Sequence, residues 1–170
     1  MADNIVLIGM PGAGKSTVGV VLAKRIGYDF CDSDLLIQRQ TGKRLSELID
    51  EHGHEGFLAI EDEINASIDL DRHVIATGGS AVYGDAAMAH LGNIGTVVYL
   101  KLSLDAVEQR VGDLTDRGVA MRPGQTLEHV YAERAVLYER YADVVVDCEG
   151  LELREVVVRV HQACASSNAG

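Results

Sequence analysis

The sequence predicts one α/β domain in which helices cover a parallel sheet. Strand-like and helix-like stretches alternate along most of the chain, as they do in successive βαβ units. The length of 170 residues suits a single domain. A glycine-rich loop also follows the first strand-like run and opens the first helix-like one. We therefore predict a single domain over residues 1–170, with neither linker nor internal repeat.

The first half of the chain contains the clearest alternation. Asn4–Ile8 is a short apolar run that suits a strand buried on both faces, and Lys15–Ile26 carries apolar residues at helical spacing. Phe30 then precedes the acidic triplet Asp32-Ser33-Asp34. Helical patterns resume at residues 35–39, 46–51 and 57–68.

The second half continues in the same way. Strands are predicted at His73–Ala76, 96–102 and 144–146, and helices at 104–111, Leu127–Tyr141 and 151–163. Residues 112–125 instead carry turn and polar residues, including Pro123.

Composition and charge narrow the class of protein. Apolar residues make up 47% and charged residues 24%, which is typical of a folded soluble domain. The net charge of −11 argues against a nucleic-acid partner. No apolar run reaches the length of a membrane span, and the N-terminus lacks a basic leader. Three separated cysteines form no disulfide framework. We expect a cytoplasmic protein without a membrane partner, either a monomer or a weak dimer.

The strongest motif spans residues 9–16, Gly-Met-Pro-Gly-Ala-Gly-Lys-Ser, which match the phosphate-binding pattern G-x-x-x-x-G-K-[ST]. Backbone amides of such a loop surround phosphate oxygens, and the helix N-terminus adds positive charge. Lys15 is expected to reach the β- and γ-phosphates, and Ser16 to bind Mg²⁺. The predicted ATP-binding residues of this segment are Gly9, Gly12, Ala13, Gly14, Lys15, Ser16 and Thr17.

A phosphate loop alone does not separate switches, motors and kinases. The chain lacks the Asn/Thr-Lys-x-Asp element with which a GTPase reads guanine. Its small size and its arginine-bearing segment at 112–125 favour a kinase that phosphorylates a small molecule, because such an enzyme needs a lid to exclude water.

Four segments together resemble the shikimate kinase family: the phosphate loop, Asp32-Ser33-Asp34, Thr77-Gly78-Gly79 and the stretch containing Arg134 and Leu137-Tyr138. The resemblance extends from Ile5 to about Asp147. It implies a three-layer fold with a five-stranded parallel sheet and helices on both faces. It also implies an acceptor-binding region at about 33–62 and a mobile lid at about 112–125. ATP and Mg²⁺ are the implied cofactors, and shikimate is the implied phosphoryl acceptor.

The resemblance assigns roles to the acidic triplet and the glycines. Asp34 matches the residue that holds the acceptor hydroxyls and acts as base, and Asp32 matches the one that holds Mg²⁺ with Ser16. A structural alternative is that Ser33 or Asp34 caps the following helix. Gly78 and Gly79 match two glycines that approach the acceptor, whereas Ser80 stands where the family has a third.

Four arginines also receive roles from the resemblance. Arg110 matches a residue that stacks near adenine. Arg122 matches the catalytic arginine of the lid, and Arg117 is an alternative in the same segment. Arg134 matches an arginine that binds the acceptor carboxylate, although a solvated helix arginine beside Glu133 is the competing interpretation.

The largest departure from the family is Leu58, because the family has an arginine there that pairs with the acceptor carboxylate. Glu61, which orients that arginine in the family, lacks this partner here. Residues 43–72 contain three basic against nine acidic residues, hence a local net charge of −6 that poorly attracts a carboxylate. A changed acceptor, such as a polyol, a hydroxy acid or an amino alcohol, is therefore the main alternative. A more remote one is a nucleotide-binding regulatory protein that has lost phosphoryl transfer.

Two further features are interpreted as structural. Residues 51–55, Glu-His-Gly-His-Glu, contain metal-ligand residue types, but the central glycine and the lack of a separate third ligand favour a solvated helix junction. Cys31, beside the acidic triplet, is interpreted as a packed side chain rather than a reactive thiol.

Overall fold

The structure is a computed structural model that describes residues 3–111 and 120–167. Its centre is a wholly parallel, five-stranded sheet with the order β2-β3-β1-β4-β5. The strands are β1 (Asn4–Ile8), β2 (Asp29–Asp32), β3 (His73–Ala76), β4 (Gly95–Lys101) and β5 (Val144–Asp147). Every residue of the central strand β1 is buried, which explains its continuous apolar run. The predicted α/β fold is confirmed.

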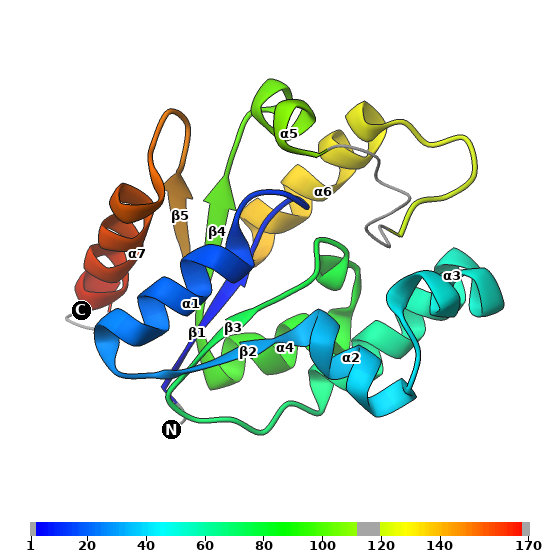
Figure 1. Cartoon of the computed structure of the whole chain (residues 1–170), viewed down its shortest axis with the longest axis horizontal. Helices are drawn as coiled ribbons and strands as arrows, with labels where there is room; N and C mark the ends of the chain where they lie inside the picture. Colours follow the sequence, from blue (N-terminus) through cyan, green and yellow to red (C-terminus); the bar gives the residue numbers. More distant parts are fainter. Residues whose placement is uncertain (1–2, 112–119, 168–170) are drawn as a thin grey trace.

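Helices cover both faces of this sheet, as Figure 1 shows. α1 and α7 pack against each other on one face, while α4 and α6 contact β4 from the other. The helices of these layers are α1 (Lys15–Ile26), α4 (Asp85–Ile94), α5 (Leu104–Arg110), α6 (Leu127–Tyr141) and α7 (Leu153–Ser167), with the short 3-10 helix η1 at Ala81–Tyr83. No helix in the described ranges is long and apolar enough to cross a membrane.

Two further helices, α2 (Ser33–Thr41) and α3 (Leu45–Ala66), lie beside the sheet next to β2 (Figure 1). They enclose a small hydrophobic cluster that is separate from the main core. We call it the acceptor-side cluster; its buried members are Ile37, Leu45, Leu48, Phe57, Ile64 and Ala120. α2 and α3 thus have a core of their own.

Some element boundaries differ from the sequence predictions. The helices predicted at 46–51 and 57–68 form one element, α3, which is interrupted at Gly53, where φ is 70° and ψ is −180°. The helix α4 was not predicted, because its buried residues Ala87, Met88 and Leu91 form only a short apolar stripe among small residues. Of the predicted lid, residues 112–119 lie outside the described residues.

Candidate active site

The phosphate loop connects β1 to α1 at the carboxyl edge of the sheet. Gly14 occupies the N-cap position of α1 with φ 90° and ψ 17°, a left-handed conformation that a residue with a Cβ rarely adopts. This turn leaves the first amides of α1 directed at the space where a phosphate would bind. The loop therefore has the backbone conformation that anion binding requires.

Lys15 folds back over this loop. Its Nζ donates to the carbonyl oxygens of Gly9 and Met10 at 2.7 and 2.8 Å. Burial lowers the pKa of Lys15 to about 8, and the nearby carboxyl groups of Asp34 and Asp32 oppose that shift. Phosphate oxygens would provide stronger acceptors than the two carbonyls, so Lys15 is positioned to turn toward a bound nucleotide.

Ser16 and Asp32 lie in direct contact although sixteen residues separate them. The Ser16 hydroxyl donates to Oδ2 of Asp32 at 2.8 Å, and Oδ1 accepts from the amides of Asp34 and Leu35 at 3.0 and 3.3 Å. Hydroxyl and carboxylate oxygens are donors that suit Mg²⁺, so the predicted pair fits this ion. Asp32 is also the cap of α2, and the suggestion that Ser33 or Asp34 caps this helix is wrong.

Because Asp32 caps the helix, the carboxylate of Asp34 is free to face the cavity. Asp34 lines the same cavity as the phosphate loop, on the first turn of α2. Burial raises the pKa of Asp34 to about 6; Asp32 adds to the rise, while Lys15 opposes it. A carboxyl group with this pKa is ionised at neutral pH and is basic enough to accept a proton from a hydroxyl group.

The cavity itself has a volume of about 530 Å³ and joins the phosphate loop to the acceptor side. Eleven of the predicted site residues line it: Gly12, Gly14, Lys15, Ser16, Thr17, Asp34, Gly78, Gly79, Ser80, Arg110 and Arg134. Gly9, Ala13, Asp32, Leu58, Glu61 and Arg122 are not among the lining residues. Arg117 lies outside the described residues.

The glycine segment after β3 allows two carboxyl groups to approach its backbone. A Cβ atom on Gly78 would lie 2.6 Å from Oδ1 of Asp34 and 2.9 Å from Oε2 of Glu61, which is closer than real Cβ contacts allow. Any larger residue would therefore displace the candidate base. Both carboxyl oxygens therefore lie within 3 Å of the same position beside Gly78.

Glu61 is almost completely buried on α3, with 2% of its surface exposed. Its Oε1 accepts a hydrogen bond of 2.6 Å from the hydroxyl of Ser80, while Oε2 has no partner among the described residues. Burial raises the pKa of Glu61 to about 7, and the hydrogen bond from Ser80 opposes the rise.

Arg134 is also buried, with 1% of its surface exposed, although it belongs to the surface-facing helix α6. It donates to the carbonyl of Ala120 at 2.6 Å, and its guanidinium lies 5.4 Å from the ring centre of Tyr83. Its Nε has no hydrogen-bond partner among the described residues. The interpretation of Arg134 as a solvated surface arginine is wrong; this cation faces the cavity without a carboxylate partner in the described ranges.

Leu58 is half-buried and packs against the acceptor-side cluster. It lies one turn before Glu61 on α3, so the buried carboxylate is preceded by an apolar residue where the resemblance implies an arginine. The acceptor end of the cavity therefore keeps one of the two cations that the resemblance implies.

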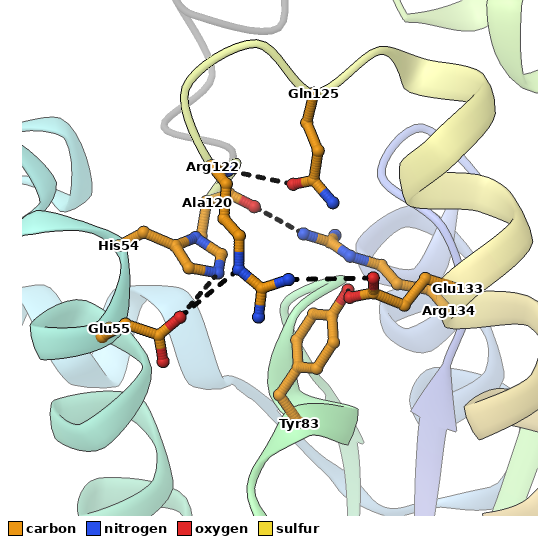
Figure 2. Close-up of polar contacts among 8 residues, drawn as sticks. All are labelled: His54, Glu55, Tyr83, Ala120, Arg122, Gln125, Glu133 and Arg134. Atoms are coloured by element: carbon orange, nitrogen blue, oxygen red, sulfur yellow. Dashed lines mark hydrogen bonds and ion pairs between the residues drawn. The ribbon is translucent and has the colours of Figure 1, made fainter.

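Arg122 connects α3 to α6 at the mouth of the site. Figure 2 shows it between Glu55 and Glu133, with its Nε 3.4 Å and its Nη1 3.9 Å from their carboxylate oxygens. Tyr83 donates to the other oxygen of Glu133 at 2.5 Å, and the amide of Arg122 donates to Oε1 of Gln125 at 2.9 Å. In this conformation Arg122 is directed toward these carboxylates rather than into the cavity.

Two tyrosines that contact cavity-lining residues were not among the predicted site residues. Tyr83 and Tyr138 support Arg134 and Gly79; the hydroxyl of Tyr138 donates to the carbonyl of Gly79 at 2.6 Å. Only the family resemblance marks Tyr138 in the sequence, and no local pattern marks Tyr83. In the described part of the chain, no group of three or more His, Cys, Asp or Glu side chains gathers as a metal site.

A parallel α/β sheet with a phosphate loop, a serine–aspartate pair for Mg²⁺ and a buried carboxylate in one cavity defines a P-loop kinase of small molecules. The family model described as shikimate kinase matches residues 11–165. The shikimate kinases of Thermodesulfovibrio yellowstonii and Francisella tularensis are each 37% identical to this chain, and each alignment covers 92% of both sequences.

Solved structures agree with these sequence relatives. A shikimate kinase from Acinetobacter baumannii in complex with shikimate superposes with a TM-score of 0.87 at 30% identity, covering 98% of this chain and 95% of that one. The enzyme from Aquifex aeolicus has a TM-score of 0.81 at 27% identity and covers 98% of both chains. The chain belongs to the shikimate kinase family and is an ATP-dependent small-molecule kinase.

Proposed function

We propose that this protein transfers the γ-phosphoryl group of ATP to a hydroxyl group of shikimate. The observation that carries the proposal is the position of Asp34, whose carboxylate lines the same cavity as Lys15 and the phosphate loop. This placement brings a base to a bound acceptor hydroxyl beside the nucleotide phosphates. Membership of the family and the buried cation Arg134 support shikimate as the acceptor, because shikimate carries a carboxylate.

In the proposed reaction the acceptor oxygen forms a bond to the γ-phosphorus, and the bond from that phosphorus to the bridging oxygen of ADP breaks. The hydroxyl proton passes to the carboxylate of Asp34. Lys15 balances charge on the phosphate oxygens, and Ser16 and Asp32 are the residues that would hold Mg²⁺. Bound Mg²⁺ neutralises charge on the β- and γ-phosphates. Arg122 and Arg117 remain the proposed lid arginines that stabilise the transferring group.

A second candidate keeps the reaction but changes the acceptor to a polyol, a hydroxy acid or an amino alcohol. The specific observation in its favour is Leu58, which packs in the acceptor-side cluster beside the buried carboxylate of Glu61. Losing one partner of a buried charge pair costs about 2–5 kcal/mol, so shikimate would bind much more weakly without a replacement cation.

A coupled assay of ADP release with shikimate and a panel of hydroxylated metabolites tests both candidates. Turnover of shikimate at sub-millimolar KM, abolished in Asp34→Asn, is the expected result. Efficient turnover of another compound alone would replace shikimate while keeping phosphoryl transfer. Tight ATP binding without turnover of any compound would instead indicate a nucleotide-binding regulatory protein. Separate Arg117→Gln and Arg122→Gln variants then identify the lid arginine from the larger loss of kcat.

A further inference from the structure

Ser80 is the serine that replaces a glycine at the acceptor end of the cavity. It follows β3 and precedes η1, and its φ of −92° and ψ of −3° require no glycine. Only 6% of its surface is exposed, yet it lines the cavity. Its hydroxyl donates to Oε1 of Glu61 at 2.6 Å. This hydrogen bond joins a residue of the cavity wall to a carboxylate buried behind it.

The direction of this hydrogen bond determines what Ser80 offers to a ligand. A serine hydroxyl has one proton and two lone pairs, whereas an ionised carboxylate only accepts. While Glu61 is ionised, the single proton of Ser80 is directed at it, and the oxygen of Ser80 presents lone pairs alone to the cavity. A ligand group beside Ser80 must therefore donate a hydrogen bond, as hydroxyl and ammonium groups do.

The partner that sets this direction is itself held only by Ser80. Among the described residues, no other donor reaches the carboxylate of Glu61, and Leu58 provides none from the preceding turn. A hydrogen bond from one donor strongly stabilises a buried, ionised carboxylate. The orientation in which the Ser80 proton is directed at Glu61 is therefore favoured.

Ser80 shares its cavity with the candidate base. Ser80 and Asp34 both line the cavity. Glu61 reaches toward both: its Oε1 accepts from Ser80, and its Oε2 lies 2.9 Å from the position of a Cβ on Gly78, which is 2.6 Å from Oδ1 of Asp34. An acceptor with two donor groups, such as a polyol or an amino alcohol, can therefore contact Asp34 through one group and Ser80 through the other.

We propose that Ser80, oriented by Glu61, is a specificity-determining residue that recognises a second hydroxyl or an ammonium group of the acceptor. This inference rests on the proposed phosphoryl transfer and narrows its substrate class to polyols and amino alcohols. Shikimate, which has more than one hydroxyl group, belongs to this class.

Steady-state kinetics of Ser80→Ala and Ser80→Thr with shikimate and with analogues lacking one hydroxyl group test the inference. Ser80→Ala should raise KM for shikimate about tenfold with little change in kcat, and Ser80→Thr should restore KM because it keeps the hydroxyl. For the analogue that lacks the recognised hydroxyl, wild type and Ser80→Ala should have equal KM. Ser67→Ala is the matched control, since the hydroxyl of Ser67, the C-cap of α3, donates to the carbonyl of Ile64 and does not line the cavity.

Two outcomes would overturn the inference: an unchanged KM for shikimate in Ser80→Ala, or an equal rise for every analogue, which a merely structural role produces. Thermal unfolding of each variant identifies loss of the fold. If Ser80→Ala does not fold, the KM of Ser80→Thr and the KM values of wild type for the analogues test the inference instead. If wild type phosphorylates none of the compounds, their dissociation constants with ADP bound are measured by calorimetry. Binding that depends on Ser80 would then keep the inference and reject the proposed transfer, whereas no binding would reject both.

Discussion

The hydroxyl of Ser16 and the carboxylate of Asp32 are joined by a hydrogen bond of 2.8 Å, while the second oxygen of Asp32 caps α2. One carboxylate thus connects the phosphate loop to the helix that carries Asp34. The proposed metal ligand is also a structural residue, and substitutions at Asp32 should separate these two properties.

Asp32→Asn and Asp32→Ala should both raise the Mg²⁺ concentration needed for half-maximal activity, by about tenfold or more. Only Asp32→Ala should lower the free energy of unfolding, by about 1 kcal/mol, because asparagine still caps a helix and alanine does not. Magnesium titrations and denaturant unfolding measure the two effects. Ser103→Ala, which removes the cap of α5, should lower stability and leave the magnesium requirement unchanged. An unaltered requirement in Asp32→Ala would exclude Asp32 from the metal site.

Asp34→Asn should abolish phosphoryl transfer, leave the affinity for ATP near that of wild type and stabilise the fold at pH 8. A carboxyl group with a raised pKa destabilises the fold in its ionised form. The cost begins as the pH rises above the unfolded value of 3.8 and is complete above the folded value of about 6. The expected gain is about 3 kcal/mol at pH 8 and less than about 1 kcal/mol near pH 4. Denaturant unfolding at both pH values measures it.

The matched control for this variant is Asp50→Asn, because Asp50 is an exposed aspartate of α3 that does not line the cavity. It should change neither activity nor the pH dependence of stability. Retained phosphoryl transfer in Asp34→Asn would remove Asp34 from the reaction.

The pH dependence of kcat/KM should reveal the same carboxyl group. Because Asp34 acts as base only when ionised, kcat/KM should rise about tenfold per pH unit below about 6 and level off above it. Glu61→Gln should keep this rising limb, since Glu61 is not the base. A profile without a rise between pH 5 and pH 7 in wild type would contradict the assignment.

Leu58→Arg should lower KM for shikimate about ten- to a hundredfold if the acceptor end is otherwise suited to a carboxylate. The new guanidinium would lie one helical turn from the buried Glu61, whose pKa of about 7 should then fall. Leu58→Met preserves the apolar packing and should leave KM unchanged. If the arginine variant uses shikimate no better than the methionine variant, the acceptor end has diverged at more positions than Leu58.

The parts of the site that sequence predicts best are those made within one short segment. The turn at Gly14 and the acidic triplet after β2 are local, so their motifs determine their backbone positions. The all-parallel fold also follows from alternation that tertiary packing did not override.

Contacts between distant segments were not predictable in the same way. Arg122 meets Glu55 across 67 residues, and Ser80 meets Glu61 across 19, in pairs that no helical or strand spacing encodes. The cation–π contact of Arg134 with Tyr83 likewise depends on how α6 packs against η1. The charge of a residue is known from the sequence, whereas the residue that pairs with it depends on how whole helices and strands pack.

The acceptor-side cluster has a consequence for how this enzyme can evolve. Its six buried residues are packed apart from the main core that supports the phosphate loop. Regions with a small core of their own open and repack at lower free energy than the centre of a domain. A substitution such as that at position 58, which packs against this cluster, therefore alters a locally packed region and leaves the core beneath the phosphate loop intact. The acceptor side can therefore change while the phosphate loop keeps its packing support.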